Sequence, residues 1–173
     1  LWVGWFGFNA GSNLEASGGA MLATVNTFIA TAAAIVSWVL VEALTRGKAS
    51  MLGAASGMIA GLVAITPAAG IAGPMGAIVM GLIVSPLCYF FVAVVKNKFG
   101  YDDTADVFGV HGIGGLFGAL ATGVFASASL GGIGYADGVT MGAQVFTQLK
   151  AVIVTILWCG ILSLAAWSVT LLL

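Results

Sequence analysis

The chain has 173 residues, of which 61% are hydrophobic and 6% are charged, and its formal net charge is −1. A soluble domain carries about 25% charged residues, so this composition excludes a water-soluble globular protein and indicates an integral membrane protein. The small negative net charge gives no reason to expect a nucleic-acid partner.

Apolar runs long enough to cross a bilayer recur along the chain, since a spanning helix needs about 20 apolar residues. We predict an all-α, polytopic helix bundle that forms a single transmembrane domain over residues 1–173. A partial span ends near Gly11, and five further spans are predicted at 20–45, 53–71, 75–95, 106–126 and 143–173. The first residues are already apolar and lack an initial methionine, so we expect the natural protein to begin earlier.

The basic residues of the connections between spans predict the orientation of the chain. They fall in two of the five connections: Arg46 and Lys48 in 46–52, and Lys96 and Lys98 in 96–105. Cytoplasmic loops are enriched in lysine and arginine, so we expect both connections, and the C-terminus, on the cytoplasmic side. Lys150, early in the last span, is the exception, and we expect its ammonium group to extend to the interface.

Glycines in the predicted spans fall into two groups. Gly53, Gly57 and Gly61 recur every four residues, a pattern that lets helix backbones approach closely. The glycines at 112, 114 and 115 surround the only histidine, and we expect them to leave space for a narrow path beside it. The sequence therefore predicts a tightly packed bundle with a thin internal conduit.

His111 is the chain's only histidine and lies a few residues inside the span 106–126. Ionisable residues within a bilayer are costly and usually functional. A neutral imidazole both donates and accepts hydrogen bonds, which suits a proton relay or a polar pore lining; the alternative is a histidine that links helices in packing. No second histidine or carboxylate cluster accompanies it in the spans, so we predict no metal, no cofactor and no enzyme.

Acidic residues are expected to have structural roles. Asp106 begins the span that carries His111, where it is expected to cap the helix or to interact favourably with the helix dipole. Asp102 and Asp103 are expected to be solvated. Glu42 is expected to pair with Arg46 one helical turn further on.

The segment 4–12 concentrates aromatic residues at the end of a helix predicted to face outward. Aromatic residues are typical of membrane interfaces, which is one interpretation. The other is a cation-capture site, since aromatic faces attract cations and the Ser12 hydroxyl offers a hydrogen bond at the same place.

Four motifs carry a resemblance to a known family. GWFGFNAGS (4–12), SGMIAGLVAITPAAG (56–70), DVFGVHGIGG (106–115) and SLGGIGYADGVTMG (129–142) resemble, in order and spacing, the ammonium transporters, in particular the bacterial Amt type. The resemblance implies an eleven-helix fold of two inverted five-helix repeats and a long final helix, a common transporter architecture. The chain corresponds to the end of the sixth span through the eleventh, which is the second repeat.

The resemblance implies roles for residues at the outer side. Ser12 resembles the hydroxyl of an ammonium-recruitment site, and Phe8 resembles one of two stacked rings that gate the pore. Trp5 resembles an indole that lines the pore, and Thr66 resembles a pore-adjacent threonine.

Further into the pore, His111 resembles the second of a pair of pore histidines. Val107 resembles an apolar constriction at the exit, and Asp106 resembles an aspartate at the cytoplasmic exit. The implied mechanism is that ammonium is recruited outside and deprotonated, and that ammonia then passes a narrow hydrophobic pore. The first histidine and the other gating phenylalanine belong to the first repeat, so we do not expect 173 residues to conduct alone.

The resemblance also implies partners: ammonium or ammonia, with methylammonium as an analogue, the lipid bilayer and two further copies in a homotrimer. A PII-type regulatory protein is expected at the connections 46–52 and 96–105, and the expected location is the plasma membrane. Three alternatives stay open. They are a membrane ammonium sensor, an electroneutral Rh-type gas channel and a purely structural half-bundle.

Overall fold

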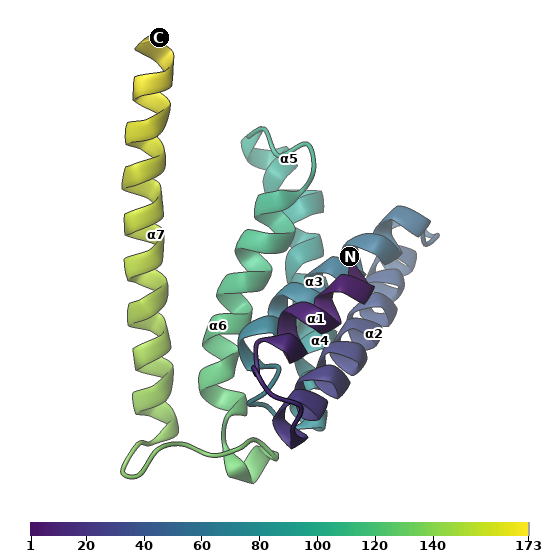
Figure 1. The fold of residues 1–173 in the computed structure, drawn as a ribbon. Helices are drawn as coiled ribbons and strands as arrows, with labels where there is room; N and C mark the ends of the chain where they lie inside the picture. The colour runs from purple at the N-terminus through teal and green to yellow at the C-terminus, as the bar shows by residue number, and fades with distance from the viewer. Residues whose placement is uncertain (173) are drawn as a thin grey trace.

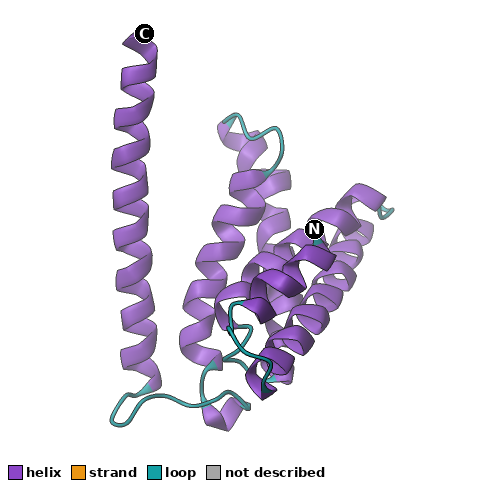
Figure 2. Ribbon diagram, viewed as in Figure 1, coloured by secondary structure: helices purple, strands orange, loops and turns teal. Residues whose placement is uncertain are grey.

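The computed structural model describes residues 1–172, and this part of the chain consists of helices and loops without any strand (Figure 2). Within that range the α-helices are α1 Trp2–Gly11, α2 Gly18–Arg46, α3 Met51–Ile65, α4 Pro74–Phe90, α5 Lys96–Phe99, α6 Ile113–Phe125 and α7 Met141–Leu172. Short 3-10 segments are η1 Thr66–Ala68 and η4 Ala128–Leu130, and π-helical segments are η2 Phe91–Val95 and η3 Phe108–Gly112. The predicted all-α class is confirmed.

Five helical stretches among the described residues are long and apolar enough to cross a membrane: Gly18–Arg46, Met51–Ala68, Pro74–Phe99, Phe108–Phe125 and Met141–Leu172. They overlap the five ranges expected from the sequence, and α1 lies where the partial span was expected. The range 53–71 was too long at its end, because the helix stops at Ala68 and the chain turns through Gly70. The last residue of the expected span 143–173 lies outside the described residues.

The helices alternate in direction, so the connections separate into two ends of the bundle (Figure 1). The connection Gly47–Ser50, the loop 100–107 and the C-terminal end of α7 lie toward one end, which we call the basic end. The loops 12–17, 69–73 and 126–140 lie at the opposite end. The two connections that carry Arg46, Lys48, Lys96 and Lys98 therefore lie at the same end, as expected for the second and fourth connections of helices that alternate in direction.

Close backbone approach holds α2 against α3 and α4. A Cβ atom at Gly57 would lie 2.6 Å from Trp38 Cβ, and one at Gly61 would lie 2.6 Å from Ala34 Cβ. On α4, a Cβ at Gly81 would lie 2.2 Å from the carbonyl oxygen of Ala30. Small residues therefore form the contact faces, as the four-residue spacing predicted.

The three glycines around His111 divide between close packing and open space. A Cβ at Gly114 would meet Val63 and the Cys88 thiol, and one at Gly112 would meet the Phe108 ring. Gly114 therefore serves helix packing, whereas Gly112 and Gly115 also line a pocket of about 300 Å³ between α6 and α7.

The last helix, α7, stands apart from the other helices (Figure 1). It leaves the bundle beside α6, where a Cβ at Gly123 would lie 2.9 Å from Val145 Cα. No residue of α7 is buried within residues 1–172. The sites described below are therefore built by α1 to α6.

Candidate functional site

A pocket of about 430 Å³ opens between the end of α1 and the turn that follows α3. We call it the outer pocket, because the loops beside it lie at the end opposite the basic end. Phe8 and Asn9 of α1 line it, together with Ser12, which directly follows α1. Thr66 and Ala69 line it from the turn. Three of the residues expected from the sequence, Phe8, Ser12 and Thr66, therefore face one space.

Trp5 is tied to this pocket by a hydrogen bond. Its indole N–H donates to Thr66 Oγ1 over 2.8 Å, and the Thr66 hydroxyl in turn donates to the Leu62 carbonyl over 2.7 Å. The Trp5 and Phe8 rings pack edge to face, with centroids 5.6 Å apart. Helix α1 thus brings its aromatic residues onto the turn that carries Thr66, although 61 positions separate Trp5 from Thr66 in the chain.

The polar and aromatic atoms of the outer pocket suit a small cation with N–H groups. The Ser12 hydroxyl donates to the Phe8 carbonyl over 2.6 Å, which leaves the lone pairs of Ser12 Oγ available to accept. The Phe8 ring is 60% exposed at the same place. Aromatic faces attract cations, and a serine oxygen accepts an N–H, so both groups can contribute to binding one cation.

His111 lies elsewhere, in the π-helical segment η3, with its side chain exposed. It lines a pocket of about 180 Å³ with Ser56 and Ile59 of α3 and with Asp106 and Val110. This pocket shares no lining residue with the outer pocket. Helix α3 joins the two, since Thr66 follows one end of it and Ser56 lies near the other.

The π-helical geometry around His111 has a packing origin. Gly109 lies against Val92 of the other π-helical segment, η2, where an added Cβ would approach Val92 Cγ2 to 2.6 Å. The Phe108 ring meets Phe91 and Tyr101 edge to face. Single π-helical turns often occur at functional sites, and here two of them pack together beside His111.

Asp106 lacks one of the two roles expected of it, the helix cap, but it stands at the start of the helix, where its negative charge suits the helix dipole. Its carboxylate pairs with the Lys96 ammonium group, and its backbone is left-handed, with φ of 55°. The cap is Asp103, expected to be solvated, whose carboxylate accepts from the backbone N–H groups of Phe108 at 3.2 Å and Gly109 at 3.1 Å. The chain turns between the two aspartates, where the Asp106 N–H donates to the Asp103 carbonyl over 3.0 Å, so the Asp103 carboxylate lies beside the first turn of the helix.

Val107 is exposed at 54% immediately before η3. It lies outside the linings of both the outer pocket and the His111 pocket. Its expected role as an apolar constriction therefore receives no support from either pocket and remains a proposal.

Removing the Asp103 cap is expected to loosen the helix start that carries His111. In Asp103→Ala, two backbone N–H groups lose their acceptor, which costs roughly 0.5–2 kcal/mol for a helix cap. Hydrogen exchange at Phe108 and Gly109 should accelerate accordingly. Asp102→Ala is the matched control, because the Asp102 carboxylate accepts from the Thr104 hydroxyl. Equal exchange rates in the two variants would contradict this role.

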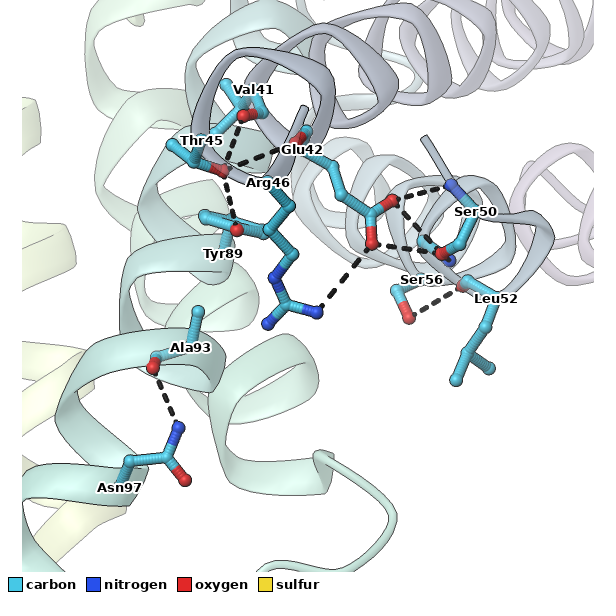
Figure 3. A network of polar contacts seen from close by, with 11 residues as sticks. Val41, Glu42, Thr45, Arg46, Ser50, Leu52, Ser56, Tyr89, Ala93 and Asn97 are labelled. Carbon is cyan, nitrogen blue, oxygen red and sulfur yellow. Dashed lines mark hydrogen bonds and ion pairs between the residues drawn. The ribbon is translucent and has the colours of Figure 1, made fainter. Parts of the chain in front are cut away.

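A second polar network lies at the basic end (Figure 3). Glu42 is buried, and its carboxylate accepts from the Ser50 N–H at 3.0 Å and from the Ser50 hydroxyl at 2.9 Å. Ser50 in turn caps α3 by accepting from the Gly53 N–H. The expected pair with Arg46 is present, but it is the longer contact at 3.9 Å. Glu42 thus serves mainly to hold the start of α3.

This network borders a chamber of about 240 Å³. The chamber and the His111 pocket share Leu52, Ser56 and Asp106 in their linings, so the two spaces adjoin. Glu42 and Asp106 each have a basic partner. The charges on the chamber wall are therefore balanced in pairs.

The sequence analysis missed three polar residues beside the outer pocket. Asn9 donates to Thr27 Oγ1 over 2.9 Å, and Asn26 donates to the Ala69 and Ala72 carbonyls. The available signal was their position, because uncharged polar residues inside an apolar span usually have a hydrogen-bonding role.

Comparison with known proteins gives a consistent result. The model of the Ammonium Transporter Family matches residues 1–173. An ammonium transporter of Aquifex aeolicus is 51% identical over 94% of this chain and 38% of its own length. An ammonium transporter of Bacillus subtilis is 50% identical over 90% of this chain and 39% of its own.

Solved structures agree with this similarity. Mep2 of Candida albicans superposes with a TM-score of 0.80 at 34% identity, over 95% of this chain and 38% of that one. A sensor Amt protein superposes with a TM-score of 0.81 at 35% identity, over 91% of this chain and 38% of that one. The chain therefore spans about two fifths of the length of the relatives it matches.

Proposed function

The chain belongs to the ammonium transporter family, and from this membership we propose that the protein transports ammonium across a membrane. The observation that carries the proposal is the outer pocket, where Ser12, Phe8 and Thr66 face one space at the end of an apolar bundle and Trp5 bonds to Thr66. Relatives described as ammonium transporters support the same substrate.

The proposed cycle begins with capture of ammonium in the outer pocket. Ser12 Oγ accepts one N–H of the cation, and the Phe8 ring stabilises its charge, while Trp5 lines the path further in. An ion that enters an apolar path loses its hydration, and the cost is far larger for a charge than for a neutral polar molecule. Ammonium therefore gives up a proton and ammonia continues along the path, while the proton crosses the membrane separately, so that one positive charge moves with each ammonia.

His111 is the proposed polar element of that path. A neutral imidazole accepts a hydrogen bond from ammonia through one nitrogen and donates through the other. Val107 and Asp106 follow it at the proposed exit, where the Lys96–Asp106 pair borders the adjoining chamber. Potassium has no proton to release, so the same path rejects it.

We further propose the setting in which this cycle operates. The protein is a multi-pass protein of the plasma membrane with its basic end and C-terminus in the cytoplasm, because lysine and arginine favour that side. The protein forms a homotrimer, and within each subunit the first repeat completes the pore. A PII-type protein binds at the connections 46–52 and 96–105. Methylammonium serves as a substrate analogue.

The test uses proteoliposomes that contain the protein as expressed from its natural gene. An ammonium pulse should evoke a saturable current, while a potassium pulse at the same concentration should not. Methylammonium uptake measured in the same vesicles detects electroneutral transport. Folded protein that shows neither current nor uptake would overturn the transport proposal.

A second candidate function is ammonium sensing. It is favoured by the similarity to a solved sensor Amt protein, at a TM-score of 0.81. A sensor binds ammonium without sustained flux. Ammonium binding with neither current nor uptake would therefore select this function over transport.

A further inference from the structure

Two adjacent polar residues in the apolar helix α2, Asn26 and Thr27, have no part in the cycle above. Both side chains are completely buried, at 0% exposure. A buried polar group in a membrane span is unfavourable unless it is hydrogen-bonded. Successive residues of a helix point about 100° apart, so the two side chains reach different neighbours.

Asn26 holds the turn that forms one wall of the outer pocket. Its amide group donates to the Ala69 carbonyl over 2.8 Å and to the Ala72 carbonyl over 2.7 Å. These carbonyls follow the end of a helix, where acceptors lack partners within the helix. Within residues 1–172, Asn26 Oδ1 is buried without a partner. A leucine of similar size would bury no unpartnered oxygen. The contribution of Asn26 is therefore that its two hydrogen bonds place the turn.

Thr27 holds the opposite wall. Its hydroxyl oxygen accepts from the Asn9 amide over 2.9 Å, which fixes the middle of α1 against α2. The two walls are then joined directly by the bond from Trp5 to Thr66. The contacts form a closed ring that runs from α2 to the turn, from the turn to α1, and from α1 back to α2.

We propose that Asn26 is a positioning residue for cation capture, and that it fixes the distance between the turn and the residues Phe8 and Ser12. The proposal rests on the proposed function of the outer pocket. Without the two bonds from Asn26, the turn is free to move away from α1, and the cation loses simultaneous contact with both walls. The path around His111 is unaffected, because its pocket has no residue in common with this ring.

The test compares transport constants in proteoliposomes of the protein from its natural gene. In Asn26→Leu, the KM for ammonium should rise about tenfold, the scale expected when a binding group is misplaced. Vmax should stay within about twofold, because capture and not passage is impaired. Ser85→Ala is the matched control, since it removes a buried bond from α4 to the Ala34 carbonyl of α2, away from the pocket.

A pair of variants at Thr27 separates positioning from loss of fold. Thr27→Val removes the acceptor for Asn9 at nearly constant volume and should also raise KM, whereas Thr27→Ser keeps the hydroxyl and should restore it. An unchanged KM in Asn26→Leu, in vesicles where the wild type transports, would overturn the inference. An equal rise in KM in Ser85→Ala would also overturn the inference, because that variant removes a bond away from the pocket. Absence of transport by the wild type would instead overturn the proposed function, and the inference with it.

Discussion

Replacement of His111 by alanine should abolish the preference for ammonium over potassium. In the proposed cycle, the imidazole of His111 is the polar group that ammonia meets after ammonium has lost a proton, and it is the only histidine among these 173 residues. Alanine removes both hydrogen-bonding nitrogens. A path that remains open then fills with water and conducts hydrated ions, and a path that collapses conducts nothing.

The measurement is the ratio of currents evoked by ammonium and by potassium in proteoliposomes. We expect this ratio to fall by at least about tenfold, equivalent to roughly 1.4 kcal/mol of discrimination. Ser168→Ala is a suitable control, because the Ser168 hydroxyl bonds within α7 to the Leu164 carbonyl, away from both pockets. An unchanged ratio in His111→Ala would refute the role of the histidine.

Much of the fold follows from the sequence because few constraints determine it. The bilayer fixes the length of a spanning segment, and the basic residues indicate which connections share a side. The four-residue spacing of Gly53, Gly57 and Gly61 also predicted the closely packed face of α3. The spacing alone did not predict the partner, since the approach of Gly61 to Ala34 depends on how α2 and α3 cross.

The candidate site was less predictable because its geometry depends on contacts distant in sequence. The resemblance to the ammonium transporters implied a pore-side role for Trp5 and Thr66, but their mutual hydrogen bond arises from the placement of α1 on the turn. Asp103 and Asp106 show the same limit. Spacing alone favoured Asp106 as the cap, whereas the left-handed backbone at Asp106 turns its carboxylate to Lys96 and leaves the cap to Asp103.

The largest effect on stability is expected from Gly81→Ala. An alanine in a helix interior normally stabilises it by roughly 1 kcal/mol relative to glycine. At Gly81, however, the new Cβ would lie 2.2 Å from the Ala30 carbonyl oxygen and 3.0 Å from the carbonyl carbon, so the backbone of α2 must move. Overpacking of this kind costs about 1–3 kcal/mol, and more where a backbone is displaced.

Movement of α2 away from α4 has a further consequence, because two hydrogen bonds cross this interface near Gly81. Ser37 donates to the Leu82 carbonyl, and Ser85 donates to the Ala34 carbonyl. Both lengthen when the helices separate, so we expect a net loss of roughly 2–3 kcal/mol. The unfolding temperature in detergent should fall by about 4–12 °C. Gly160→Ala, whose added Cβ meets no heavy atom within 4 Å in residues 1–172, should melt no lower than the wild type. If Gly81→Ala and Gly160→Ala have the same unfolding temperature, close approach of α4 to α2 is not what holds these helices together.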